Sequence, residues 1–221
     1  MVSPINSMKI SPSKSIAHQL LEIGAVKLDV NEGFIWTSGI VSPIYCDNRI
    51  INSKVDVRSD VISAFSNLVL EHYMKDAQHD VQIIAGVSTG GIPYGSLIAD
   101  RLKLPFIYVR EKRKEHGLKK MVEGYYETGN RVILIEDHIS TGVSSIGAVK
   151  ALREEGLELV ALLSIMTYRF KEAEEAFKNE GIEYNSLCDL DTILEVAKEE
   201  GKITDAEAAY ILKFRDNHTT K

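Results

Sequence analysis

The sequence predicts an α/β fold: an open, mostly parallel sheet with helices on both faces. Four short apolar runs predict the strands, because they are continuous rather than alternating, as in strands buried on both faces. These runs are residues 81–87, 104–109, 132–135 and 157–166. Helical spacing of apolar residues along 93–103 and 144–155 places a helix after the first and third runs, which is the order of a parallel sheet.

The segments on either side of this region are expected to be mainly helical. Apolar spacing predicts a helix around 16–23, which Ser13 can cap and Gly24 can end. A long amphipathic helix is expected over 55–73, whereas residues 33–49 have the Gly, Ser and Pro content of an irregular segment. Three C-terminal helices are expected over 171–179, 191–200 and 205–214.

The composition is that of an ordinary globular protein. Of 221 residues, 44% are hydrophobic and 26% are charged, which excludes a disordered or collagen-like chain. The net charge of −6 argues against a dedicated nucleic-acid binder. Cys46 and Cys188 form no CxxC pair, and neither a signal peptide nor an apolar run of membrane length is visible. We therefore expect a cytoplasmic protein that binds neither nucleic acid nor membrane.

The strongest functional signal is residues 132–144, VILIEDHISTGVS. An apolar strand is followed by two carboxylates, Glu136 and Asp137, and then by a Ser/Thr/Gly loop that opens a helix. Backbone N–H groups and the helix dipole make such a loop a phosphate site. The carboxylates would repel a phosphate, so a ribose diol or a Mg²⁺ ion suits them better. The alternative is a capped helix after an ordinary turn.

A second Gly-rich turn, Ser88-Thr89-Gly90-Gly91, follows the strand 81–87. Glycines allow the backbone to approach a charged ligand closely. The turn alone could equally be an ordinary strand–helix connection. Two such loops in one sheet suggest a ligand with two separated phosphate groups.

Residues 110–120, REKRKEHGLKK, form a basic run in an acidic chain. The run lacks an apolar period and is expected to be an exposed loop. It could be a solvated hairpin, a nuclear-localisation or nucleic-acid patch, or a lid that places cations on a pyrophosphate. Within a lid, His116 would have a catalytic role.

Residues 34–49, FIWTSGIVSPIYCDNR, place aromatic side chains around two Ser-containing turns. The segment could cap one end of the sheet, or it could hold a planar base through apolar contacts. Arg49 could pair with a ligand carboxylate or with its neighbour Asp47.

Together these segments resemble the orotate phosphoribosyltransferases, a type I phosphoribosyltransferase family. The resemblance rests on FxxxSGxxSPxYxDNR at 34–49, RxxxKxHG at 110–117 and the strand–loop motif that binds 5-phosphoribosyl 1-pyrophosphate (PRPP) at 132–144. It implies one phosphoribosyltransferase domain, 1–221. Its parts are an N-terminal helix and base-binding hood (about 1–55), a PRPP-binding core (about 81–170) and a C-terminal helical segment (about 171–221).

The resemblance implies Mg²⁺-dependent transfer of phosphoribose from PRPP to N1 of orotate, giving orotidine 5′-monophosphate (OMP) and pyrophosphate in pyrimidine synthesis. It implies a homodimer in which the basic loop acts in the neighbouring subunit's site, with Mg²⁺ carried on PRPP rather than by protein ligands. The implied catalytic residues are Arg110, Lys114, His116 and Asp137. The implied PRPP-binding residues are Arg110, Lys112, Lys114, His116, Ser88, Thr89, Gly90, Gly91, Glu136, Asp137, His138, Ile139, Ser140, Thr141, Gly142, Val143 and Ser144. The implied orotate-binding residues are Ser140, Arg49 and Tyr45.

The chain departs from the family pattern at two places. Thr37 stands where many members have lysine, and Glu111 stands where many have a second lysine, with Lys112 next. Some members use an arginine after the fourth strand for the orotate carboxylate, and Arg169 lies in that region. A phosphoribosyltransferase for another base and a PRPP-sensing transcription regulator remain alternatives.

Overall fold

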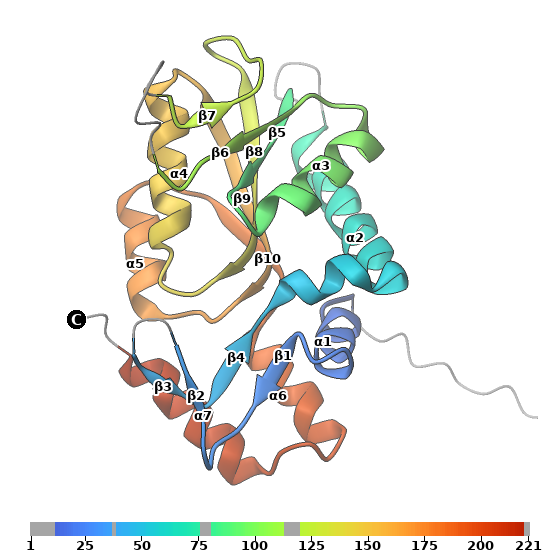
Figure 1. Cartoon of the computed structure of the whole chain (residues 1–221), viewed down its shortest axis with the longest axis vertical. Coiled ribbons are helices and arrows are strands. Elements are labelled where there is room, and N and C mark those ends of the chain that lie inside the picture. The colour runs from blue at the N-terminus through green and yellow to red at the C-terminus, as the bar shows by residue number, and fades with distance from the viewer. Residues whose placement is uncertain (1–11, 37–38, 76–80, 113–119, 219–221) are drawn as a thin grey trace, which may run out of the picture.

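The computed structural model describes residues 12–36, 39–75, 81–112 and 120–218. A six-stranded sheet forms its centre, in the order β10-β9-β8-β5-β6-β7 (Figure 1). All neighbouring strands are parallel except β6 and β7, which are antiparallel. The strands are β5 (Ile83–Val87), β6 (Phe106–Val109), β7 (Val122–Glu123), β8 (Arg131–Ile139), β9 (Glu158–Thr167) and β10 (Tyr184–Asp189). The predicted mostly parallel sheet is confirmed.

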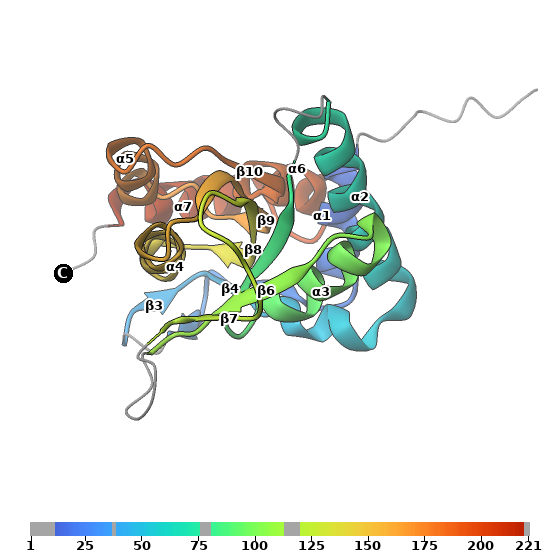
Figure 2. The same cartoon turned by 90° about the horizontal axis from the view of Figure 1, so that it is seen from above.

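Two helical layers cover the sheet, one on each face (Figure 2). On one face lie α2 (Val55–Tyr73) and α3 (Gly91–Leu102); on the other lie α4 (Val143–Glu154) and α5 (Lys171–Asn179). Alternate residues of β8 serve the two layers: Ile133 and Ile135 pack in the core beneath α2 and α3, and Val132 and Leu134 pack beneath α4 and α5. This alternation explains why residues 132–135 of the strand are all apolar.

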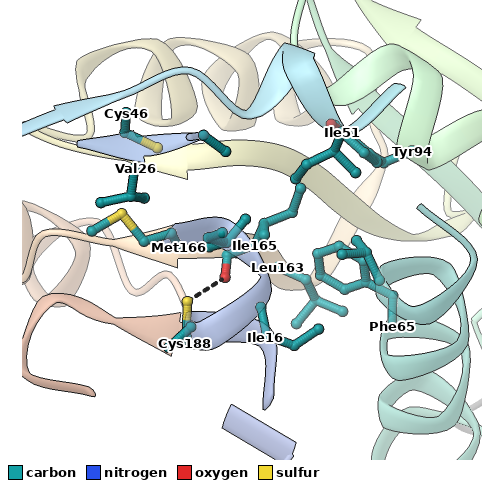
Figure 3. Packing of buried hydrophobic residues seen from close by; sticks show 14 of the residues in the cluster. Ile16, Val26, Cys46, Ile51, Phe65, Tyr94, Leu163, Ile165, Met166 and Cys188 are labelled. Atoms are coloured by element: carbon teal, nitrogen blue, oxygen red, sulfur yellow. Dashed lines mark hydrogen bonds between the residues drawn. The ribbon is translucent and has the colours of Figure 1, made fainter. Parts of the chain in front are cut away.

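The core on the α2 face also includes the N-terminal elements and β10. Figure 3 shows Ile16, Val26, Ile51, Phe65, Leu163 and Ile165 packed together, with Cys188 donating to the carbonyl oxygen of Ile165. Both cysteines are buried and unpaired.

The N-terminal segment contains more regular structure than predicted. After α1 (Pro12–Glu22), β1 (Val26–Leu28) pairs with β4 (Ile44–Cys46), and β2 (Phe34–Ile35) pairs with β3 (Val41–Ser42), both antiparallel. A 3₁₀ helix, η1 (Asn48–Ser53), leads into α2. The expected cap at Ser13 is wrong: Ser13 lies inside α1, and its hydroxyl is 3.5 Å from that of Thr192.

The C-terminal segment differs from the prediction in one element. The helices α5, α6 (Leu190–Glu199) and α7 (Asp205–Asn217) match the expected positions. Between α5 and α6, β10 joins the sheet edge and was not predicted, because its sequence YNSLCD is largely polar. Backbone hydrogen bonds to β9 hold β10 in the sheet, and such pairing cannot be inferred from the amino-acid composition of the strand.

The strand β8 is longer than its apolar run. It continues through Glu136, Asp137 and His138 to Ile139, with Glu136 paired to Ser164 and His138 to Met166 of β9. The two carboxylates therefore lie within the strand rather than after it, so that their backbone is fixed by the sheet.

No helix in the described part of the chain is both long and apolar enough to cross a bilayer.

Replacing Gly91 with Ala is expected to destabilise the fold, because the new Cβ would lie 2.1 Å from the carbonyl oxygen of Ile135. Overpacking of this kind costs about 1–3 kcal/mol or more. The control is Gly147→Ala in α4, where an added Cβ meets nothing within 4 Å and should stabilise the helix by about 0.5–1 kcal/mol. Urea unfolding of both variants measures the difference, and equal stabilities would contradict the prediction.

Candidate active site

The turn after β5 and the end of β8 are in close contact at the carboxyl edge of the sheet. A Cβ on Gly90 would lie 2.4 Å from Cγ of Asp137, and one on Gly91 would meet the backbone of β8. The structure therefore brings the predicted phosphate loop after β5 against the acidic end of β8. Only glycine allows the backbone after β5 to lie this close to the Asp137 carboxylate.

The loop after β8 leads directly into α4. Gly142 has φ +77°, a left-handed conformation that glycine adopts without strain, and a Cβ there would meet the Phe177 ring at 2.9 Å. The first N–H groups of a helix have no intrahelical acceptors, so the start of α4 provides donors for an anion. Ser140 and Thr141 lie at the edge of this loop, and Ser144 and Val143 are exposed at the helix start.

The two carboxylates of β8 are almost fully buried, with 5% of Glu136 and 8% of Asp137 exposed. Glu136 accepts hydrogen bonds from the hydroxyls of Ser144 (3.3 Å) and Ser145 (3.4 Å) and from the backbone N–H of Asp137 (3.1 Å). Nδ1 of His138 is 3.2 Å from Oδ2 of Asp137.

These surroundings give the two carboxyls different pKa values. Burial, followed by the nearby charge of Asp137, raises the pKa of Glu136 well above its usual range. Burial also acts to raise the pKa of Asp137, but the His138 ring beside it outweighs that effect and the pKa is lowered. Asp137 is therefore the ionised partner at neutral pH.

Asn48 and Tyr94 hold the backbone beneath this pair. The Asn48 side-chain amide donates to the carbonyl oxygen of Asp137 (2.8 Å), and the Tyr94 hydroxyl donates to the carbonyl oxygen of Asn48. Both residues are fully buried. Neither was predicted as a site residue, although Asn48 belongs to the DNR end of the N-terminal motif.

A pocket of about 490 Å³ opens beside the loop of Ser140 and Thr141. Four separate segments line it: the β2–β3 hairpin together with β4, the end of β8 with its loop, the residue after β9, and the residue after α7. The lining residues are Ile35, Trp36, Ile40, Tyr45, Cys46, His138, Ser140, Thr141, Tyr168 and His218. The lining thus combines the hydroxyl groups of the loop with an aromatic part formed by the rings of Trp36, Tyr168 and His218.

Trp36 is the centre of the aromatic part. Its ring lies 5.7 Å from that of Tyr168 and 5.9 Å from that of His218, both in T-shaped contacts. Sequence reasoning missed Tyr168 and His218. Tyr168 directly follows β9, so the strand-end rule could have found it, whereas nothing in the sequence around His218 indicates a site.

The two predicted residues of the N-terminal motif have different surroundings. Tyr45 lines the pocket, with its ring 5.7 Å from that of Phe34. Arg49 is mostly exposed and forms two hydrogen bonds with Asp47, Nε to Oδ1 at 2.7 Å and a second to Oδ2 at 3.0 Å. Of the two partners considered for Arg49, the local one is present.

The basic run is described only at its ends. Arg110 forms an ion pair with Glu123 at 3.2 Å, and Lys112 is exposed. Lys114 and His116 lie outside the described residues. Ile139 is buried in the core, so any contact it makes with a ligand involves its backbone.

The described residues contain no group of three or more His, Cys, Asp or Glu side chains able to bind a metal by themselves. Mg²⁺ is usually bound by one or two carboxylates together with substrate phosphates and water. The carboxylate of Asp137, whose pKa is lowered, fits a Mg²⁺ that arrives with a phosphorylated ligand.

Replacing Glu136 with Gln is expected to change how stability depends on pH. The pKa of this carboxyl is higher in the folded protein than in the unfolded chain. The free energy of unfolding therefore falls as pH rises above the pKa of the unfolded chain, because folding then has to keep a proton that the unfolded chain releases. Gln imitates the protonated form and does not titrate. The melting temperature of the ligand-free variant, relative to that of wild type, should therefore increase from about pH 5 to about pH 8.

The matched control is Glu175→Gln, at an exposed position on α5. Its melting temperature should follow that of wild type at every pH. Parallel curves for Glu136→Gln and wild type would contradict a raised pKa of Glu136 in the folded protein.

Comparisons with known proteins agree with this arrangement. Residues 59–198 match the phosphoribosyl transferase domain family. The chain is 41% identical over 211 residues to the orotate phosphoribosyltransferase of Lactococcus lactis subsp. cremoris, covering 96% of this chain and 99% of that protein. The crystal structure of orotate phosphoribosyltransferase from Aeropyrum pernix superposes with a TM-score of 0.71 at 28% identity, covering 86% of this chain and 99% of that one.

A longer protein contains the same fold. The structure of Leishmania donovani UMP synthase gives a TM-score of 0.75 at 28% identity, covering 91% of this chain but only 42% of that protein. The resemblance drawn from the sequence motifs is confirmed by the family match and by the near-complete alignment. On these grounds the chain belongs to the phosphoribosyltransferase family, among the orotate phosphoribosyltransferases.

Proposed function

We propose that this protein transfers the 5-phosphoribosyl group from PRPP to N1 of orotate, forming OMP and pyrophosphate in pyrimidine synthesis. The observation that carries the proposal is the close contact of the Gly90 backbone with the Asp137 carboxylate, beside a pocket that combines loop hydroxyls with aromatic rings. One ligand can then reach a phosphate loop, a carboxylate and an aromatic surface at once.

The ribose 5-phosphate binds at Ser140–Ser144, where the start of α4 offers N–H donors. Asp137, ionised at neutral pH, accepts from the ribose hydroxyls. Glu136 can join it only by giving up its hydrogen bonds from Ser144 and Ser145. His138, Ile139, Thr141, Gly142 and Val143 complete this part of the PRPP site.

The pyrophosphate lies on the turn Ser88–Gly91 and under the basic loop. Arg110, Lys112, Lys114 and His116 provide positive charge to the departing group, and Arg110 exchanges Glu123 for pyrophosphate when the ligand binds. Mg²⁺ carried on PRPP neutralises further charge on the phosphate oxygens when bound.

Orotate occupies the aromatic part of the pocket, against Tyr45 and with Ser140 at its edge. Arg49 contacts orotate only after leaving Asp47. The planar base is held by ring contacts rather than by a covalent bond.

The reaction is a dissociative displacement. The C1–O bond to pyrophosphate breaks early, positive charge develops on the ribose, and orotate N1 attacks from the pocket. No protein nucleophile takes part: the site positions two anionic substrates and stabilises the leaving group. The basic loop excludes water that would otherwise hydrolyse PRPP.

We also propose that the whole chain acts as one catalytic unit, since both the N-terminal hairpin and His218 near the C-terminus line one pocket. The protein works as a homodimer in the cytoplasm, with each basic loop acting in its neighbour's site and no role for nucleic acid or membrane.

The direct test mixes the protein with Mg²⁺, PRPP and orotate and follows the loss of orotate ultraviolet absorbance together with pyrophosphate release. Lys114→Ala and His116→Ala should each lower turnover by about 10²–10³, the effect of removing one donor to a developing anion. The control is Lys150→Ala, which removes a lysine of α4 that forms an ion pair with Glu180. This variant should keep full turnover.

The proposal would be overturned if the protein bound PRPP but left orotate unchanged. Turnover of another base would then identify a different phosphoribosyltransferase, and binding of DNA with no turnover would identify a regulator.

Mixing two inactive variants tests the shared site. Lys114→Ala breaks the basic loop and Asp137→Asn breaks the ribose site, so a mixed dimer contains one complete site only if the loop acts across the interface. Random exchange of subunits in a symmetric dimer should restore roughly a quarter of wild-type activity. No recovery after verified exchange would show that each loop serves its own subunit.

A further inference from the structure

The aromatic part of the pocket contains no arginine or lysine among its lining residues. Of the ten described residues that line the pocket, His138 and His218 are the two that can carry positive charge. Orotate, if the proposed function holds, brings a carboxylate into this space. An anion in a partly apolar pocket requires a charged or hydrogen-bonding partner.

Arg169 does not supply this partner in the structure. Its Nε is 2.9 Å from Oδ2 of Asp189, and the residue lines a separate, more polar cavity of about 250 Å³ with Ser186 and Asn185. The arginine that follows β9 is therefore held away from the aromatic pocket by an ion pair.

His138 already lies beside a carboxylate of the protein. Its Nδ1 is 3.2 Å from Oδ2 of Asp137, and its ring is 6.1 Å from that of Tyr168. A second carboxylate would have to compete with Asp137 for this ring.

His218 is held in place in the aromatic part. Its ring stacks on Phe170 with centroids 4.2 Å apart and contacts Trp36 and Phe214, and only 4% of its side chain is exposed. Nε2 is 3.6 Å from Oε1 of Glu172, on the first turn of α5, and has no hydrogen-bond acceptor within the described ranges.

We propose that His218 binds the carboxylate of the orotate base. The His218 ring stands between Glu172, which lies near Nε2, and the pocket that receives the ligand carboxylate. His218 is thus a substrate-binding residue that distinguishes a carboxylated pyrimidine from an uncharged one.

A comparison of two nucleotides measures the contribution of the carboxylate to binding. OMP and uridine 5′-monophosphate (UMP) differ only in that group, and neither reacts without pyrophosphate. Wild type should bind OMP more tightly than UMP in calorimetric titrations. His218→Phe keeps the stacking on Phe170 but lacks N–H donors, so its affinity for OMP should fall by about 10-fold to 100-fold, the value of one charged hydrogen bond. Its affinity for UMP should stay the same.

Further variants separate binding from packing. His218→Gln keeps a neutral donor and should show an intermediate OMP preference. Glu175→Gln is matched to Glu172→Gln on the same helix, and only Glu172→Gln should weaken OMP binding. His72→Phe, the same change at an exposed position on α2, should behave as wild type. In turnover assays His218→Phe should raise the KM for orotate and leave the KM for PRPP unchanged.

An unchanged ratio of OMP to UMP affinity in His218→Phe would overturn the inference, as would an equal loss for both nucleotides, which indicates a packing role. These results are distinct from failure of the proposed function, in which wild type itself would neither convert orotate nor prefer OMP. Trp36, the single tryptophan of the chain, gives a second binding signal because it contacts His218.

Discussion

The contact between the turn after β5 and the buried end of β8 is the constraint on which the site depends. Gly90 and Gly91 lie where any side chain would collide with Asp137 or with the backbone at Ile135. Because β5 and β8 are neighbouring parallel strands, their carboxyl ends meet at one edge of the sheet. The absence of a Cβ at Gly90 and Gly91 then allows the turn after β5 to contact β8 directly. Asn48 and Tyr94 then attach the N-terminal segment to the same point.

The electrostatics of the site follow from this geometry. Two adjacent carboxyls in a buried strand cannot both be ionised at low cost, and their surroundings separate their roles. Glu136 is turned toward the hydroxyls at the start of α4, whereas Asp137 is beside an imidazole. In the proposed function, Glu136 braces the loop that binds phosphate and Asp137 presents negative charge to the ligand.

Much of the fold could be predicted because strands buried on both faces of a sheet have continuous apolar sequences. The run 81–87 and the helix 171–179 needed no tertiary information. The extension of β8 through Glu136 and His138 could not be predicted, since its polar residues are held by pairing with β9. The polar edge strand β10 was missed for the same reason. Within the candidate site, the loops and carboxylates are local in sequence and could be proposed from it. His218 could not, because it reaches the pocket only through the packing of α7, 182 residues from Trp36.

The position of α1 has a consequence for how the chain folds during synthesis. Lys14 of α1 forms ion pairs with Glu195 and Glu199 of α6, and the apolar face of the helix packs in the core shared with α6. A ribosome makes α1 well before α6. The face of α1 that packs on β10 and α6 therefore remains without these partners until residues 184–199 are translated, and such exposed apolar surface promotes aggregation or chaperone binding. Closing a loop of this length also slows folding more than it lowers stability. Translation of β10 and α6 thus completes the packing of a helix made about 170 residues earlier.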